Sequence, residues 1–129
     1  MMIGELTQKI HLQTPKQSLS VEEALKSPRL VRKSLEVPLV LQDQPLFVGR
    51  DETAVDLLIP SHFVSRRHAL LFKKGTDYFV QDLHSKNGTF INNKKLPSGT
   101  CCAHPLKNGD RIRFNIIEFL FVIPEETKS

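Results

Sequence analysis

The chain lacks tryptophan and contains only two cysteines and one tyrosine among its 129 residues. The two cysteines, Cys101 and Cys102, are neighbours. A structural zinc site needs its cysteines spaced apart, and a disulfide framework needs several pairs. We therefore expect two reduced thiols, at least one of them in the core, and neither a bound metal nor a cofactor.

Long apolar runs are missing as well. No stretch approaches the roughly 18 consecutive apolar residues of a membrane-spanning helix. The first residues also lack the basic and then apolar pattern of a secretory signal. We expect a cytoplasmic protein that binds no membrane. The net charge of +4 is small, so the bulk charge is explained by a solvated surface rather than by a polyanion-binding tail.

The composition changes near residue 28, which predicts three parts. Residues 1–28 are polar and are expected to form a flexible N-terminal tail. Ser20 and Glu23 have the spacing of a helix capping box, and Pro28 would end the short helix that follows them. We expect one folded domain over residues 29–124, since a chain of this length usually forms a single core. Residues 125–129 are expected to form a C-terminal tail.

Short apolar segments with turn residues between them occupy the predicted domain. Turn signals recur every eight to twelve residues, and the connections leave no room for crossover helices. This pattern predicts an all-β protein with an antiparallel β-sandwich. The expected strands are 30–31, 35–41, 46–48, 56–59, 69–72, 78–83, 89–92, 94–96, 101–106, 111–114 and 117–123.

Three polar blocks stand at the ends of these segments, where a sheet passes its side chains into loops. They are Gly49-Arg50, Ser65-Arg66-Arg67-His68 and Asn87-Gly88. Together they supply a guanidinium group, a hydroxyl group, further cations and an Asn-Gly turn. Such a set suits a doubly charged, oxygen-rich group such as a phosphate.

In this order and at this spacing, the three blocks resemble the signature of the forkhead-associated (FHA) domain. The resemblance extends from about Leu30 to Ile123. It implies a β-sandwich of about eleven strands with its ligand loops at one end. It also implies a module that binds phosphothreonine peptides downstream of a Ser/Thr protein kinase.

The resemblance assigns a role to each residue of the blocks. It implies that Arg50, Ser65 and Arg66 contact the phosphate and that Asn87 holds the peptide backbone. Lys86 stands where family members often have threonine, so the peptide preference is open, although a lysine can still reach a phosphate or an acidic residue. The resemblance implies that His68 braces the loops without contacting the ligand. We also expect Gly49 and Gly88 to serve the backbone conformation and Asn92 to be structural, so these four residues would support the site.

Each of these residues also has an ordinary structural explanation. Arg50 could be a surface cation paired with Asp51 or Glu52, and Ser65 could cap its own turn. An enzyme with Ser65 as nucleophile and His68 as base is disfavoured, because no orienting acid and no Gly-x-Ser-x-Gly elbow are present. No Gly-x-x-x-x-Gly-Lys phosphate loop supports ATP hydrolysis. His62, His68, His84 and His104 show no metal-ligand spacing.

Two alternative functions remain open at this stage. A phosphate-independent scaffold would keep the fold and use a sheet face or edge. A nucleic-acid binder would use the basic residues Arg66, Arg67, Lys73, Lys74, Lys94 and Lys95. These residues fall on separate turns, and no motif of basic and aromatic residues for base stacking is present. The tail also suggests self-regulation, with phosphorylated Thr7 or Thr14 occupying the chain's own site.

Overall fold

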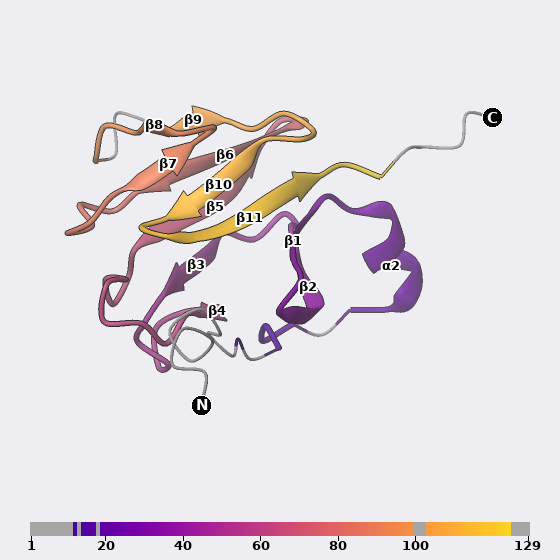
Figure 1. The fold of residues 1–129 in the computed structure, drawn as a ribbon. Helices are drawn as coiled ribbons and strands as arrows, with labels where there is room; N and C mark the ends of the chain where they lie inside the picture. The colour runs from indigo at the N-terminus through magenta and orange to yellow at the C-terminus, as the bar shows by residue number, and fades with distance from the viewer. Residues whose placement is uncertain (1–11, 13, 18, 100–102, 125–129) are drawn as a thin grey trace.

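A computed structural model describes residues 12, 14–17, 19–99 and 103–124 (Figure 1). These residues form one short helix and eleven strands, as the sequence predicts. Cys101, Cys102 and Thr7 lie outside the described residues. The elements are α2 (Val21–Lys26), β1 (Arg29–Arg32), β2 (Leu35–Val40), β3 (Leu46–Gly49), β4 (Leu57–Leu58), β5 (Ala69–Lys74), β6 (Asp77–Asp82), β7 (Thr89–Ile91), β8 (Lys94–Lys95), β9 (His104–Pro105), β10 (Arg111–Phe114) and β11 (Ile117–Val122).

The strands form two sheets that pack face to face. One sheet has the order β2-β1-β11-β10-β7-β8, and the other has the order β4-β3-β5-β6-β9. Alternate side chains of each strand point into the space between the sheets. On β11, for example, Ile117, Phe119 and Phe121 are buried while Glu118 and Leu120 are exposed. The β-sandwich of about eleven strands that the sequence predicts is thus confirmed.

One strand pair departs from the antiparallel pattern that the sequence predicts. β4 runs parallel to β3, with Val48 opposite Leu57. The connection after Arg50 returns to the start of β3, where the Asp56 side chain accepts a hydrogen bond from the Phe47 N–H at 2.8 Å. The Asp56 N–H in turn donates to the Phe47 carbonyl. These two bonds begin β4 beside the start of β3, so both strands run in the same direction.

The short helix α2 has both hydrogen bonds of the predicted capping box. The Glu23 N–H donates to the Ser20 hydroxyl, and the Ser20 N–H donates to the Glu23 carboxylate. None of the residues of α2 is buried. The segment before it contacts the sandwich: Leu12 is 4% exposed, and the Gln17 amide bonds both the N–H and the carbonyl of Val40. Among the described residues, no helix is long and apolar enough to cross a membrane.

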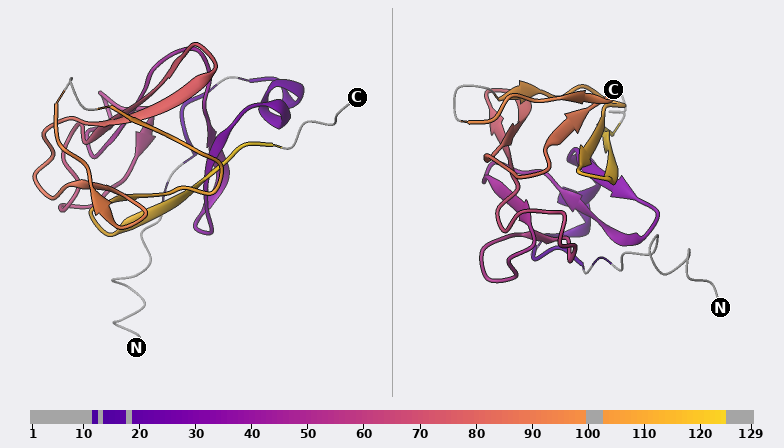
Figure 2. Two further views of the ribbon diagram at one scale, coloured as in Figure 1. Left: turned by 90° about the horizontal axis from the view of Figure 1, so that it is seen from above. Right: turned by 60° about the vertical axis from the view of Figure 1, so that its left-hand side comes forward.

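The strand register brings the polar blocks to one end of the sandwich. In one sheet, Val48 pairs with Ala69 and Ala69 pairs with Asp82. The end of β3, the start of β5 and the end of β6 therefore lie side by side. In the other sheet, Thr89 pairs with Phe114 and Phe114 with Ile117. This end lies on the left in Figure 1, and α2 lies on the right there and in the left view of Figure 2.

Candidate functional site

The first loop is held by a close approach between two backbones. The Arg50 N–H donates to the carbonyls of Ser65 and Arg66, both at 3.0 Å. A Cβ atom on Gly49 would lie 2.0 Å from the Arg66 carbonyl oxygen. Only glycine leaves room for this contact. The sequence therefore specifies, through Gly49, how closely the Arg50 loop lies against the Ser65 loop.

The side chains of Arg50 and Ser65 each keep a donor for a ligand. Arg50 is exposed, and its Nε donates to the Val64 carbonyl at 2.9 Å. Within the described residues, no acceptor bonds either of its two terminal nitrogens. The Ser65 oxygen accepts a hydrogen bond from the Lys86 N–H at 3.0 Å. A hydroxyl group that accepts from one partner can still donate its own hydrogen to another.

His68 connects two of the loops from inside the protein. It is fully buried, its Nδ1 accepts a hydrogen bond from the Ser65 N–H at 3.0 Å, and its Nε2 lies 2.9 Å from the Gly88 carbonyl. These partners require the neutral ring with hydrogen on Nε2. Burial lowers the pKa of His68 by more than the Gly88 bond and the Asp82 charge raise it.

Asp82 organises the third loop, and the sequence analysis did not single it out. It is 1% exposed. Burial by itself raises its pKa, but hydrogen bonds from Ser85, Ser98 and Thr89 outweigh that effect, so the pKa is lowered. The Thr89 and Ser98 hydroxyls each donate at 2.6 Å. A carboxylate followed three residues later by serine is a signal that could have identified this network.

The network extends from Asp82 to the Asn-Gly turn. The Ser85 hydroxyl donates to Asp82 and accepts from the Gly88 N–H at 3.0 Å. The turn between them presents Lys86 and Asn87, and the Asn87 side-chain nitrogen donates to the Phe63 carbonyl at 2.8 Å. Of Asn87 and Gly88, only Gly88 has left-handed backbone, with φ +91°; His84, earlier in the same connection, also has it, with φ 54°. Because β6 and β7 belong to different sheets, the turn carries the chain from one sheet to the other and does not close a hairpin.

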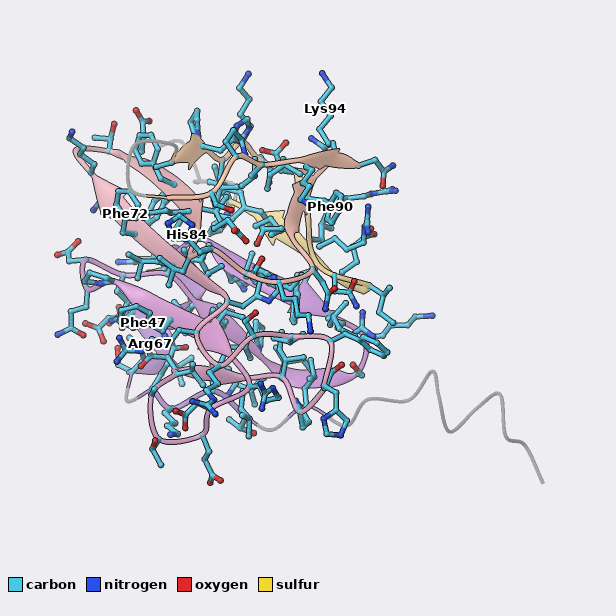
Figure 3. The ribbon with its side chains drawn as sticks, turned by 90° about the vertical axis from the view of Figure 1, so that its left-hand side faces the viewer. Phe47, Arg67, Phe72, His84, Phe90 and Lys94 are labelled. Atoms are coloured by element: carbon cyan, nitrogen blue, oxygen red, sulfur yellow. The ribbon has the colours of Figure 1, made fainter. Side chains whose placement is uncertain are left out.

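Of the other candidate residues, Arg66 and Lys86 lie in the loops of this centre, whereas Asn92 does not. Arg66 and Lys86 are exposed beside Ser65 and Asn87 respectively. Figure 3 looks onto this end of the sandwich and shows Arg67 beside Phe47, with the guanidinium carbon 4.6 Å from the ring centre. Arg67 therefore packs on the outer face of the five-stranded sheet. Asn92, at the other end of β7 from Gly88, bonds Asp110 and the Arg111 N–H.

The arrangement suits anion binding and not acyl transfer. The His68 nitrogens bond the Ser65 N–H and the Gly88 carbonyl, so neither nitrogen faces the Ser65 hydroxyl as a general base would. The hydroxyl of Ser65 and the guanidinium of Arg50 instead belong to two loops that are bonded to each other. Fixed donors of this kind bind phosphate oxygens. Within the described residues, no three His, Cys, Asp or Glu side chains are grouped as metal ligands.

Comparison with known proteins decides the family. The profile of the FHA domain matches residues 46–115, which is more than half of the chain and includes all three polar blocks. The chain belongs to the FHA domain family.

Curated FHA relatives are longer than the part that matches. FhaB of Mycolicibacterium smegmatis is 32% identical over 80 residues, covering 62% of this chain and 50% of FhaB. The probable E3 ubiquitin-protein ligase dma1 of Schizosaccharomyces pombe is 36% identical over 76 residues, covering 51% of this chain and 28% of dma1. The chain thus spans half or less of each of these relatives.

Solved FHA structures share the sandwich. Mycobacterium tuberculosis EmbR, in complex with a low-affinity phosphopeptide, superposes with a TM-score of 0.69 at 26% identity, covering 99% of this chain and 30% of EmbR. An FHA domain studied for phosphothreonine-dependent interactions superposes with a TM-score of 0.65 at 26% identity, covering 78% of this chain and 97% of that domain.

Proposed function

We propose that this FHA domain binds peptides or proteins that carry a phosphothreonine, at the loop end formed by Arg50, Ser65, Arg66, Lys86 and Asn87. A phosphothreonine brings about −1.5 to −2 charges and three acceptor oxygens. The guanidinium of Arg50 can donate two parallel hydrogen bonds to such a group. In this proposal, Arg50, Ser65 and Arg66 bind the phosphate oxygens, and Asn87 forms hydrogen bonds with the ligand backbone.

The observation that carries this proposal is the bonding of Ser65. Its carbonyl accepts from the Arg50 N–H, its N–H donates to His68, and its hydroxyl oxygen accepts from the Lys86 N–H. One residue therefore holds all three polar loops together, and its hydroxyl hydrogen is still available. A site whose donors are already in place binds a ligand with little further ordering.

Lys86 supplies a cation where family members often carry threonine. Its N–H is bonded to Ser65 and its side chain is exposed. We propose that the ammonium group contacts either the phosphate or an acidic residue of the ligand. An exposed pair of this kind contributes about 1 kcal/mol or less. Lys86 therefore adjusts the peptide preference, and Arg50 carries most of the affinity.

The partner is proposed to be the product of a Ser/Thr protein kinase, and one such partner is the chain itself. Thr14 is exposed and lines a groove with residues of β2, while Thr7 lies outside the described residues. The proposal therefore covers phosphorylation of Thr7 or of Thr14. Phosphorylated chain that bound a test phosphopeptide as tightly as the unmodified chain would exclude it.

The decisive experiment measures fluorescence anisotropy with a phosphothreonine peptide library, its phosphoserine twin and its unphosphorylated twin. We expect phosphothreonine-dependent binding that Arg50→Ala weakens by at least about 30-fold, since removing one partner of a charge-assisted bond costs about 2 kcal/mol or more. Arg67→Ala is the matched control, because Arg67 packs on Phe47 outside the site. Binding without phosphate, and unchanged by Arg50→Ala, would favour the scaffold function instead.

A further inference from the structure

Two large apolar side chains are exposed in loops next to the Asn87-Gly88 turn. Phe63 is 59% exposed in the connection between β4 and β5, and Ile116 is 62% exposed in the turn between β10 and β11. Single exposed apolar residues are common and need no explanation. These two, however, come from loops that are each bonded to the same turn.

Two hydrogen bonds make that attachment. The Phe63 carbonyl accepts from the Asn87 side-chain nitrogen at 2.8 Å. The Asn115 N–H, one residue before Ile116, donates to the Gly88 carbonyl at 3.0 Å. Both exposed apolar residues therefore lie in loops bonded to the turn that contains Asn87, the residue proposed to hold the ligand backbone.

The Phe63 loop is ordered by its own hydrogen bonds. The Phe63 N–H donates to the Ser61 hydroxyl at 3.2 Å, and the Val64 N–H donates to the Ser61 carbonyl at 3.0 Å. The next carbonyl, that of Val64, accepts from Arg50. Phe63 is therefore held at the surface beside the phosphate-binding arginine, although nearby buried positions are filled by smaller aliphatic side chains such as Val64 and Ile59.

Ile116 occupies a position that turn chemistry does not explain. Phe114 pairs with Ile117, so Asn115 and Ile116 alone form the turn. Such turns favour Gly, Asn and Asp. Asn115 follows that preference with a φ of 57°, and its carbonyl accepts from Arg113. Ile116 is 62% exposed, so burial in the core does not account for a large apolar side chain at this position.

We infer that Phe63 and Ile116 select phosphothreonine peptides with two large apolar residues, one contacting each side chain. This inference rests on the proposed function. An extended peptide projects successive side chains to opposite sides. Because both loops are bonded to the turn, a peptide whose backbone crosses Asn87 can bring one side chain to Phe63 and another to Ile116. The ligand class is a phosphothreonine segment with apolar rather than charged neighbours.

The test is a positional scan around phosphothreonine with the full chain. Leu, Ile, Phe, Ser and Asp are placed in turn at each of the four positions on either side, and binding is measured by anisotropy. We expect about tenfold preference for apolar residues at two positions. Phe63→Ser should remove the preference at one of these positions, and Ile116→Asn should remove it at the other. Leu120→Ser is the matched control, because Leu120 is 38% exposed in the middle of β11.

The outcomes separate this inference from the proposed function. Phosphate-dependent binding with equal affinity for Leu and Asp at every position would overturn the inference and leave the proposed function intact. The same would follow if Phe63→Ser and Ile116→Asn kept the full preference profile while folding normally by circular dichroism. No phosphate-dependent binding in any peptide would overturn both.

Discussion

The two sides of the sandwich are held in different ways. At the loop end, buried polar side chains bond residues that are far apart in the sequence: His68 connects Ser65 to Gly88, and Asp82 accepts from Ser98. On the side of α2, the helix has no buried residue, and its capping bonds join Ser20 to Glu23, three residues apart. The loop end is therefore fixed by buried hydrogen bonds, whereas α2 depends on local bonds and a few surface contacts.

This difference predicts a ranking of stability effects. Changes to the buried network at the loop end should lower the free energy of unfolding most, because they leave hydrogen-bonding groups without partners inside the protein. Changes around α2 should lower it least, because water can replace the lost partners. The four predictions below test that ranking from the largest expected effect to the smallest.

Asp82→Ala should have the largest effect. It removes the acceptor for the hydroxyls of Ser85, Thr89 and Ser98, and hydrogen bonds to a charged group contribute about 1.5–3 kcal/mol each. Thr89 is fully buried, so its hydroxyl would also lose its partner where water cannot replace it. We expect a loss of about 3 kcal/mol or more in the free energy of unfolding, measured by urea denaturation. Asp43→Ala is the control, because the Asp43 side chain is 89% exposed in its ion pair with Lys73. Equal effects of the two changes would contradict the buried network.

The pH dependence of stability should report the neutral state of His68. Its pKa is lower in the folded state, chiefly through burial, so the folded protein binds fewer protons than the unfolded chain. The stabilisation is complete above the unfolded pKa of about 6.5 and decreases as the pH falls below it. The pKa of Asp82 is also lowered, but its unfolded pKa is about 4. Asp82 therefore lowers the stability only near and below pH 4, outside the range in which His68 titrates.

The measurement is urea denaturation at pH 7.5 and pH 5.5, beside an NMR titration of the histidine rings. We expect the wild-type protein to be less stable at pH 5.5 and the His68 ring to titrate below 6.5. His62→Gln is the control, because it removes an exposed histidine from the same loop and keeps His68. A His68 ring that titrated at or above 6.5 would contradict the hydrogen bond from the Ser65 N–H to Nδ1.

Much of the fold could be predicted from the sequence, because the strand pattern and the capping box are local. The parallel course of β4 could not, since it depends on the hydrogen bonds between Asp56 and Phe47. The Asn-Gly pair predicted a tight turn, but β6 and β7 lie in different sheets, so the connection crosses between the layers.

Some residues of the candidate site could likewise be predicted from the sequence, and others could not. Arg50, Ser65 and Asn87 belong to short motifs, and the structure brings them to one end of the sandwich. Asp82 was missed, because its partners lie three, seven and sixteen residues along the chain and meet only in the folded protein. The exposure of Phe63 and Ile116 was not predicted either, since nothing in their local sequence separates them from core residues.

Gln17→Ala should have a smaller effect than Asp82→Ala. The Gln17 amide bonds the N–H and the carbonyl of Val40 at 2.9 and 2.6 Å, in the manner of a neighbouring strand. Val40 belongs to β2, the edge strand of its sheet. Two neutral bonds at a partly exposed edge contribute about 1–2 kcal/mol together. Gln17→Glu serves as a second variant, because a carboxylate keeps the acceptor for the Val40 N–H and loses the donor to its carbonyl. An effect of Gln17→Ala as large as that of Asp82→Ala would contradict the ranking.

Ser20→Ala should have the smallest effect. It removes the acceptor for the Glu23 N–H, and the loss of such a cap lowers helix stability by about 1 kcal/mol. Because α2 buries none of its residues, most of that loss stays within the helix. We expect amide hydrogen exchange to become faster in α2, while exchange in β5 and β6 and phosphopeptide affinity stay unchanged. Ser20→Asp is the matched control, since aspartate is an equally good N-cap and should preserve the slow exchange. If Ser20→Ala also weakened phosphopeptide binding, the helix would be coupled to the loop end, and the contrast between the two sides would have to be abandoned.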